Sequence, residues 1–221
     1  MNTVERFVYI VRHGTTDWNQ SGRIQGHFDP PLNAAGRTQA HLVSQRLRQL
    51  GATALYSSDL QRTYETAQII GQVTGLRVIQ KTGLREMHFG RWQGWTFQQI
   101  RDQDPTGYAA RRAQPYDVPP PGGETWRRFY DRAVRAVEEI LLNTAAERLI
   151  VVTHSGVCTV LGLRALGLDC TGKRTFSNDN CSLHTIAISG AQWRAVALND
   201  VAHLSVEPSQ DALPASRYPS T

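Results

Sequence analysis

The strongest constraint on the fold of this chain is the segment Leu149–Thr153, a run of apolar and β-branched residues with no charged residue inside it. A run of this kind is typical of a strand that is covered on both faces within a parallel sheet. Similar short runs predict strands over Phe7–Val11, Ala54–Ser57 and Leu76–Gln80. The sequence therefore indicates a mostly parallel central sheet.

Helices are predicted between the strands. Over Asn33–Leu50, apolar residues recur on one helical face until Gly51 ends the pattern. Asp59 is placed to cap the next helix, and Gly71 and Gly75 are expected to end it. The alternation of strands and helices predicts an α/β fold built in layers.

Two further helices are expected in the second half of the chain. Thr125 is predicted to cap a long helix with an apolar stripe from Trp126 to Leu141, and another helix is expected from Gly156 to about Leu166. Two late strands, Leu183–Ile188 and Trp193–Leu198, are expected to form a hairpin across residues 189–190.

Residues 83–123 differ in character from the rest. The run P-P-P-G-G at residues 119–123 excludes a helix or a central strand there. We expect an excursion from the sheet, with a short helix near Phe97–Asp102. Its aromatic residues either roof a ligand pocket or form a small local core, and both interpretations stay open. They are Trp92, Trp95, Phe97, Tyr108, Tyr116 and Trp126.

The expected domain organisation is simple. No internal repeat or linker divides the chain, so residues 1–206 are predicted to form one domain that carries the excursion at about 83–123. From Glu207 onward, prolines and few apolar residues predict a loosely ordered tail over 207–221.

The charge of the chain points to an anionic ligand. The formal net charge is +5, and all of the 24 basic residues except Lys81 and Lys173 are arginines. The arginine guanidinium grips phosphate or carboxylate groups through two hydrogen bonds at once. Because the arginines are scattered, they favour small phosphorylated molecules over nucleic acid as partners.

The cysteine content and the apolar runs bear on the compartment. Three cysteines without C-x-x-C spacing predict neither a disulfide framework nor a zinc site, and buried thiols suit a reducing compartment. The apolar stretches are far shorter than the ~20 residues of a membrane-spanning helix, and the first residues do not look like a signal peptide. We therefore expect a cytoplasmic protein without membrane contact.

Polar side chains follow three of the predicted strands. Arg12 and His13 follow the first, His154 follows the fully apolar strand, and Arg62 lies in the first turn of the helix after the strand Ala54–Ser57. Ligands of open parallel sheets bind beyond the carboxyl ends of the strands. Each residue also has an ordinary structural explanation: a backbone-bonded histidine, or an arginine in a surface ion pair. A zinc site is a competing explanation for the histidines, but it lacks an evident third ligand.

Glu86 opens the glycine-rich excursion. It stands among bulky apolar neighbours, a setting that suits a carboxyl group for general acid catalysis. The competing interpretation is an exposed glutamate that pairs with Arg85 or Arg91.

Four motifs occur in an order that resembles the histidine phosphatase superfamily, also called the phosphoglycerate mutase-like family. They are R-H-G at residues 12–14, S-D-L-x-R-T-x-x-T-A at 58–67, L-R-E-x-x-F-G-x-W-x-G at 84–94 and T-H-S-G-V at 153–157. The resemblance extends from Phe7 to about Leu204. It implies an α/β fold of the phosphoglycerate mutase type, a three-layer α/β/α sandwich with a mostly parallel sheet.

The resemblance also implies roles for individual residues. His13 matches the nucleophile that becomes phosphohistidine, and Glu86 matches the general acid/base. Arg12, Arg62 and His154 match the phosphate pocket, where a protonated His154 is expected to add positive charge. The implied chemistry needs no metal and no cofactor.

Three more positions are assigned to the substrate pocket. Asn19 and Gln25 match positions that often line it, and Ser155 adjoins His154. The sequence departs from the usual family pattern at Thr15, where Glu or Gln is common, and at Ser155, where Gly is common. Both departures bear on the fine geometry of the pocket and leave the reaction type unaffected.

The function expected from this resemblance is hydrolysis of a small phosphorylated metabolite, with inorganic phosphate as product. The motifs look like those of broad-specificity, alpha-ribazole and glucosyl-phosphoglycerate phosphatases. A phosphoglycerate mutase is the alternative, followed by a non-catalytic phospholigand-binding protein. A homodimer is left open as an oligomeric state.

Overall fold

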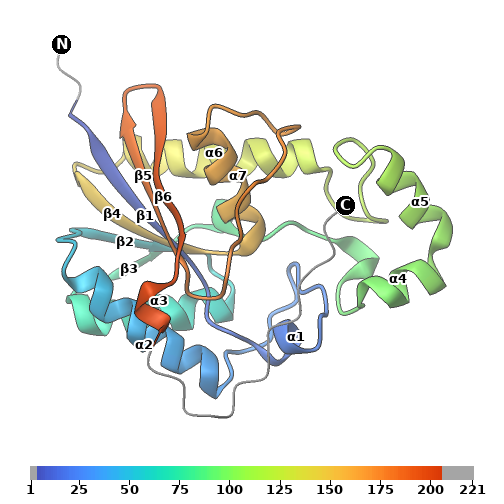
Figure 1. Cartoon of the computed structure of the whole chain (residues 1–221), viewed down its shortest axis with the longest axis horizontal. Helices are drawn as coiled ribbons and strands as arrows, with labels where there is room; N and C mark the ends of the chain where they lie inside the picture. The colour runs from blue at the N-terminus through green and yellow to red at the C-terminus, as the bar shows by residue number, and fades with distance from the viewer. Residues whose placement is uncertain (1–3, 206–221) are drawn as a thin grey trace.

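A computed structural model describes residues 4–205 and contains one six-stranded sheet with the order β3-β2-β4-β1-β5-β6 (Figure 1). The four strands β3, β2, β4 and β1 run parallel, β5 is antiparallel to β1, and β6 is antiparallel to β5. The mostly parallel sheet is therefore confirmed. The strands are β1 (Arg6–Arg12), β2 (Ala54–Ser57), β3 (Val78–Gln80), β4 (Arg148–Thr153), β5 (Leu183–Ser189) and β6 (Gln192–Asp200).

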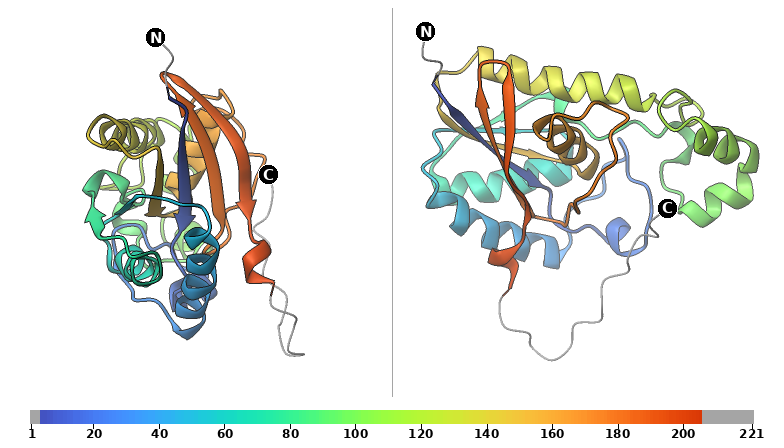
Figure 2. Two further views of the ribbon diagram at one scale, coloured as in Figure 1. Left: turned by 90° about the vertical axis from the view of Figure 1, so that its left-hand side faces the viewer. Right: turned by 45° about the horizontal axis from the view of Figure 1, so that its top comes forward.

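Helices cover both faces of the sheet and make the expected three layers. Helices α2 (Ala34–Arg48) and α3 (Gln61–Thr74) pack on one face, and α6 (Trp126–Leu142) and α7 (Ser155–Ala165) pack on the other (Figure 2). The shorter helices are α1 (Asp17–Gln20), α4 (Phe97–Gln103) and α5 (Pro105–Ala113), with 3-10 turns at Thr82–Leu84, Gly90–Trp92 and Ala202–Leu204.

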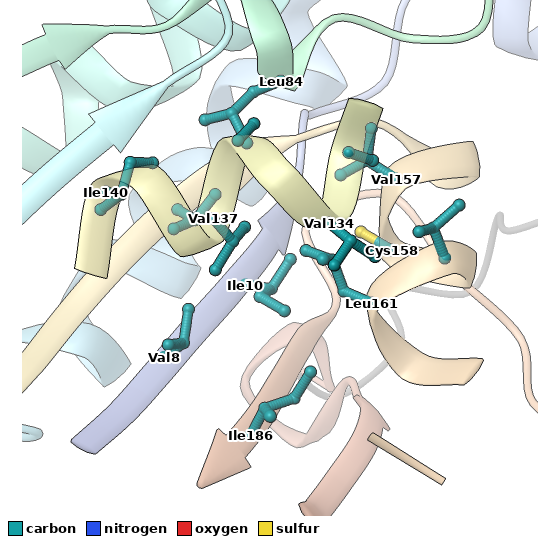
Figure 3. Close-up of a cluster of buried hydrophobic side chains, with 14 of the residues drawn as sticks. Val8, Ile10, Leu84, Val134, Val137, Ile140, Val157, Cys158, Leu161 and Ile186 are labelled. Atoms are coloured by element: carbon teal, nitrogen blue, oxygen red, sulfur yellow. The ribbon is translucent and has the colours of Figure 1, made fainter. Parts of the chain in front are cut away.

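The sheet separates two hydrophobic cores because successive strand residues point to opposite faces. In β1, Val8 and Ile10 join the core under α6 and α7, whereas Tyr9 and Val11 join the core under α2 and α3. Figure 3 shows the first core, where α6, α7 and the sheet meet. This burial on both faces explains the unbroken apolar runs of β1 and β4.

Two details of helix α3 differ from expectation. Leu60 occupies the N-cap position without a side-chain hydrogen bond, so the prediction that Asp59 caps this helix was wrong. The Asp59 carboxylate is instead paired with the guanidinium of Arg85. Gly71 lies within the helix, where a Cβ atom would stand 2.6 Å from the carbonyl oxygen of Leu76. Gly75, at φ 74°, ends the helix as predicted.

The excursion contains α4 and α5, which project from one end of the sheet (Figures 1 and 2). Helix α5 was not predicted from the sequence; it begins with Pro105 in the first turn and is capped by Asp104. Trp92 is buried and donates its indole N–H to Asp104 at 2.8 Å, which favours the local-core interpretation for this ring. Phe97, in contrast, is half exposed.

The remaining predictions concern single residues and the chain ends. Cys158, Cys170 and Cys181 are all free and buried, as expected. The hairpin strands are confirmed, with Ser189 as the last residue of β5 rather than part of the turn. The predicted loose tail over 207–221 lies outside the described residues. Within residues 4–205, no helix combines the length and the apolar character needed to cross a bilayer.

Candidate active site

The strand order brings three of the predicted site segments to one edge of the sheet. β4 lies between β2 and β1, so Ser57 is paired with Val152 and Arg12 with Thr153. The residues that follow these strands, including His13 and His154, therefore lie side by side. The rings of these two histidines are 5.4 Å apart and meet edge to face. The sequence could not show this because it does not give the order of the strands.

His13 is buried and its tautomer is fixed by the backbone. Its Nδ1 atom lies 2.7 Å from the carbonyl oxygen of Gly14, which can only accept, so Nδ1 carries the proton. The Nε2 atom keeps its lone pair. Burial, followed by the charges of Arg62 and Arg12, holds the pKa of His13 well below its usual value. The ring is therefore neutral at physiological pH and nucleophilic at Nε2.

Gly14 allows the turn after β1 to approach helix α2 closely. A Cβ atom on Gly14 would stand 2.4 Å from the carbonyl oxygen of Gly36. The amide N–H of Gly14 donates to the hydroxyl of Thr66 at 3.1 Å. Any larger residue at position 14 would push the His13 backbone away from the sheet edge.

Arg62 is a buried cation at the start of helix α3. Its side chain is almost fully buried, and its Nη1 and Nη2 atoms donate to the carbonyl oxygens of Phe28 at 2.7 Å and Gly26 at 2.8 Å. The Asp29 carboxylate is 3.6 Å away, and the Nε–H of Arg62 has no partner. Burial lowers the pKa of Arg62 to about 10, which still leaves it charged at neutral pH. A buried charge with an unused donor favours an anionic ligand.

His154 is fully buried between Arg62 and Ser58. Nη2 of Arg62 donates to its Nδ1 at 3.1 Å, and its Nε2 lies 3.0 Å from the Ser58 hydroxyl. Because arginine can only donate, Nδ1 carries no proton and the ring is neutral. Burial and the charge of Arg62 hold the pKa of His154 well below its usual value. The protonated His154 expected from the sequence is therefore corrected to a neutral ring with its proton on Nε2.

Arg12 supplies the second guanidinium. Its Nη1 donates to the carbonyl oxygen of Asn178 at 2.6 Å, which orients the side chain. Its Nε–H is buried without a partner, as is that of Arg62. The site therefore contains two unsatisfied guanidinium donors, which favour a multi-oxygen anion such as phosphate.

The Glu86 carboxylate is held by two backbone amides. Oε1 accepts from the N–H of Met87 at 2.9 Å, and Oε2 accepts from the N–H of Gly156 at 3.0 Å. A Cβ atom at position 156 would stand 2.2 Å from Oε1, so only glycine leaves room for this contact. Arg85 is paired with Asp59, which argues against the ion pair considered between Glu86 and Arg85.

The main chain of Glu86 is also fixed. Its carbonyl oxygen accepts from Nε2 of His27 at 2.8 Å and from Nη2 of Arg132 at 3.1 Å. The His27 ring in turn meets the His88 ring edge to face at 4.8 Å. These contacts hold the carboxylate at the start of helix α7, whose N-cap residue is His154.

The three additional pocket residues have different surroundings. Asn19 is engaged by Thr16, because its Oδ1 accepts from both the amide and the hydroxyl of that residue at 3.0 Å. Gln25 is buried and its Oε1 has no partner. Ser155 is half-buried, and its carbonyl oxygen accepts from Asn178 at 2.9 Å. Of these, Gln25 offers an unused polar atom.

Several residues around the site were missed by the sequence analysis. Ser58 contacts His154, Asn178 orients Arg12, and Asn180 donates to the carbonyl oxygen of His13 at 2.9 Å. Their sequence signal is weak because single serines and asparagines are common in loops. Within the described part of the chain, no three His, Cys, Asp or Glu side chains gather as a metal-binding group.

Comparison with known proteins identifies the class. Residues 8–201 match the model of the histidine phosphatase superfamily, branch 1. The chain is 39% identical over 201 residues to phosphoglycerate mutase-like protein 4 of Arabidopsis thaliana, covering 89% of this chain and 86% of the relative. It is 35% identical to the metal-independent phosphoserine phosphatase of the same plant, covering 90% of this chain and 83% of the relative.

Solved structures agree with this relationship. A mycobacterial glucosyl-3-phosphoglycerate phosphatase aligns with a TM-score of 0.79 at 33% identity, covering 88% of this chain and 98% of that one. The alpha-ribazole phosphatase of Shigella flexneri aligns with a TM-score of 0.82 at 26% identity, covering 88% and 96%. The chain therefore belongs to the histidine phosphatase superfamily. Within that family it is an enzyme of the phosphatase type.

Proposed function

We propose that this protein hydrolyses phosphomonoesters of small metabolites through a phosphohistidine on His13. The observation that carries this proposal is one cluster: a neutral buried His13 with a free Nε2, beside two guanidinium groups whose Nε–H donors are unused. Relatives and structural neighbours that are named as phosphatases of phosphoserine, glucosyl-3-phosphoglycerate and alpha-ribazole phosphate support a small phosphorylated substrate.

The first step transfers the phosphoryl group to the enzyme. Nε2 of His13 attacks phosphorus, the bond from phosphorus to the ester oxygen breaks, and charge accumulates on the equatorial oxygens. Arg12 and Arg62 offset this charge, and the Nε2–H of His154 can turn from Ser58 to donate to a phosphate oxygen. A protonated Glu86 gives its proton to the leaving alkoxide, which departs as the alcohol.

The second step returns the enzyme to its starting state. Glu86, now a carboxylate, takes a proton from water while the water oxygen attacks the phosphohistidine. The bond between nitrogen and phosphorus breaks, and the electron pair returns to Nε2 of His13. Inorganic phosphate then leaves, and Glu86 is again protonated. In both steps Arg12 and Arg62 offset the negative charge of the phosphoryl group.

A phosphoglycerate mutase is the alternative, because the relative with 39% identity is named phosphoglycerate mutase-like. A mutase would retain the phosphohistidine and return the phosphoryl group to another hydroxyl of the substrate. A non-catalytic phospholigand-binding protein fits less well, since binding alone does not require both a nucleophilic His13 and a held Glu86.

Two experiments test the proposal. The first screens phosphorylated metabolites for phosphate release, and the expected result is turnover of at least one phosphomonoester. The second identifies the product from 3-phosphoglycerate. Free phosphate supports a phosphatase, whereas 2-phosphoglycerate without net phosphate release would establish the mutase. A H13A variant that retains phosphate release would contradict both.

The cellular setting is part of the same proposal. Three free, buried cysteines suit a reducing compartment, and we propose a cytoplasmic location on that basis. A homodimer is a separate prediction, tested by light scattering during size-exclusion chromatography. Nucleic acid is not proposed as a partner.

A further inference from the structure

The loop Asn178–Ser182, which leads into β5, makes several contacts with the backbone and side chains at the end of β1. The carbonyl oxygen of Asn178 accepts from Nη1 of Arg12 at 2.6 Å. Nδ2 of Asn180 donates to the carbonyl oxygen of His13 at 2.9 Å, and the Cys181 amide donates to the carbonyl oxygen of Arg12 at 3.0 Å. The conformation of this loop therefore sets where two of the reactive residues stand.

The loop does not hold this conformation by packing alone. Cys181 has a φ of 55°, in the left-handed region that a cysteine side chain disfavours. Asn178 and Cys181 are buried, and Cys181 packs in the core under α2 and α3, whereas Asp179 between them is exposed. A strained and partly exposed loop needs fixed partners if it is to orient other residues.

One such partner is Asn199 near the end of β6. The amide N–H of Asp179 donates to Oδ1 of Asn199 at 2.8 Å, and Nδ2 of Asn199 donates to Oδ2 of Asp179 at 2.8 Å. The two bonds close a ring between β6 and the loop. A side chain that bonds in both directions fixes its partner in position and rotation, which a single bond cannot do.

The backbone conformation of β6 directs the side chain of Asn199 toward the loop. Asn199 has a φ of 56°, which asparagine tolerates better than most residues. The pairing of β5 with β6 is irregular between Leu183 and Thr185, opposite this position. Such irregularities redirect a side chain out of the regular pattern of the strand. The backbone N–H of Asn199 also donates to Nδ1 of His184 at 3.2 Å, so the backbone of Asn199 is held as well.

We propose that Asn199 is a positioning residue for phosphoryl transfer, which acts through Asp179 and the loop on Arg12 and His13. Asn199 is not placed to touch the phosphate, and nothing in the mechanism above uses it. This inference rests on the proposed function, because it assumes that His13 accepts the phosphoryl group. Its effect should fall on the rate of His13 phosphorylation rather than on folding.

The test uses N199G, because glycine adopts the left-handed conformation freely and keeps the backbone amide bonded to His184. Only the two side-chain bonds to Asp179 are lost. V196G is the matched control: it places a glycine in the same strand, at a residue that is 47% exposed and whose side chain has no polar atom. The rate of phosphorylation of His13 is measured as the rate of 4-nitrophenol release in the first turnover. The enzyme is mixed with saturating 4-nitrophenyl phosphate at a temperature well below Tm.

We expect N199G to slow this step about tenfold, and V196G to leave it within about twofold of the original protein. D179N keeps an acceptor for Nδ2 of Asn199 and should retain most of the rate, whereas D179A should not. The double variant N199G/D179A should be no slower than N199G alone, since both changes break the same ring.

Three outcomes would overturn the inference: N199G within about twofold of the original rate, equal losses in N199G and V196G, or additive effects in the double variant. If N199G does not fold, the rates of D179A and D179N are compared instead. Rates within about twofold of each other would overturn the inference. A failure of the proposed function looks different, because the unsubstituted protein would then give no phosphohistidine at all.

Discussion

Nη2 of Arg62 lies 3.1 Å from Nδ1 of His154, and this contact fixes the charge state of the second histidine. Arginine can only donate, so the imidazole must accept and is neutral, with its remaining proton on Nε2. The positive charge of the site therefore resides on the guanidinium groups. His154 contributes a directed hydrogen bond instead of a charge.

The first prediction concerns the nucleophile. H13A should abolish turnover and leave the fold intact, because it removes the unprotonated Nε2 atom that takes the phosphoryl group in the proposed mechanism. In the unsubstituted protein, a rapid quench with labelled substrate should trap an acid-labile, base-stable label on histidine. H41A, at an exposed position of α2, is the control and should retain activity. Label on serine or cysteine would refute the assignment.

The second prediction concerns Arg62. R62K should lower kcat/KM by roughly ten- to a thousandfold, taking about 1.4 kcal/mol for each factor of ten. Lysine keeps a charge but cannot bond Phe28, Gly26 and His154 at once as the guanidinium does. R48K, at an exposed position, is the matched control. Kinetics of R62K close to those of R48K would place Arg62 outside the reaction.

The third prediction separates the two roles of Glu86. E86Q should slow transfer most from alkyl phosphates, whose alkoxide needs a proton as it leaves. Release of 4-nitrophenolate needs little help, so the first turnover of its ester should be much less affected. Phosphohistidine should then accumulate and give a burst, read by single-turnover kinetics.

For E86Q, the comparison of alkyl phosphates with aryl phosphates serves as the control. Loss of a bond to Met87 or Gly156 would disturb the pocket for every substrate alike. Equal slowing of alkyl and aryl transfer would therefore show that Glu86 is not the general acid, and His88 would be examined next.

The fourth prediction concerns stability and pH. Burial lowers the pKa of His184 to about 4 from its usual 6.5, and the pKa values of His13 and His154 are lowered in the same direction. Below pH 6.5 the unfolded chain therefore binds more protons than the folded chain. The contribution of these histidines to the free energy of unfolding is fully present above that pH and is lost as the pH falls. For His184 the loss approaches roughly 3 kcal/mol by pH 4.

Urea unfolding measured from pH 8 to pH 4 checks this expectation. The midpoint should be flat at the alkaline end and decline below about pH 6.5. Removing the buried His184 should reduce the slope of this decline. A midpoint that rises on acidification would contradict the sign of the shifts.

The fifth prediction concerns metal ions. Activity should survive exhaustive treatment with EDTA, because Arg12 and Arg62 supply the positive charge that phosphoryl transfer needs. The assay compares phosphate release before and after chelation. Loss of activity that zinc or magnesium restores would mean that a metal takes part.

Much of the fold could be predicted because its signals are local. The apolar run of β4 reports burial on both faces, and Thr125 caps α6 as its sequence context indicated. Helix α5 was missed because an arginine- and alanine-rich segment without a buried residue carries no apolar stripe. The cap of α3 was misassigned because Asp59 has a stronger partner in Arg85, which lies far along the chain.

The sequence by itself determined the strands, most helices and the kinds of reactive side chains at the strand ends. It also determined the family, through motifs whose order does not depend on knowing the fold. Only the tertiary structure decided that β4 lies between β2 and β1, that His154 is neutral, and that Asn199 reaches the loop beside His13. The physical reason is distance along the chain. Periodicity acts between near neighbours, whereas desolvation and hydrogen-bond partners come from segments that meet only after folding.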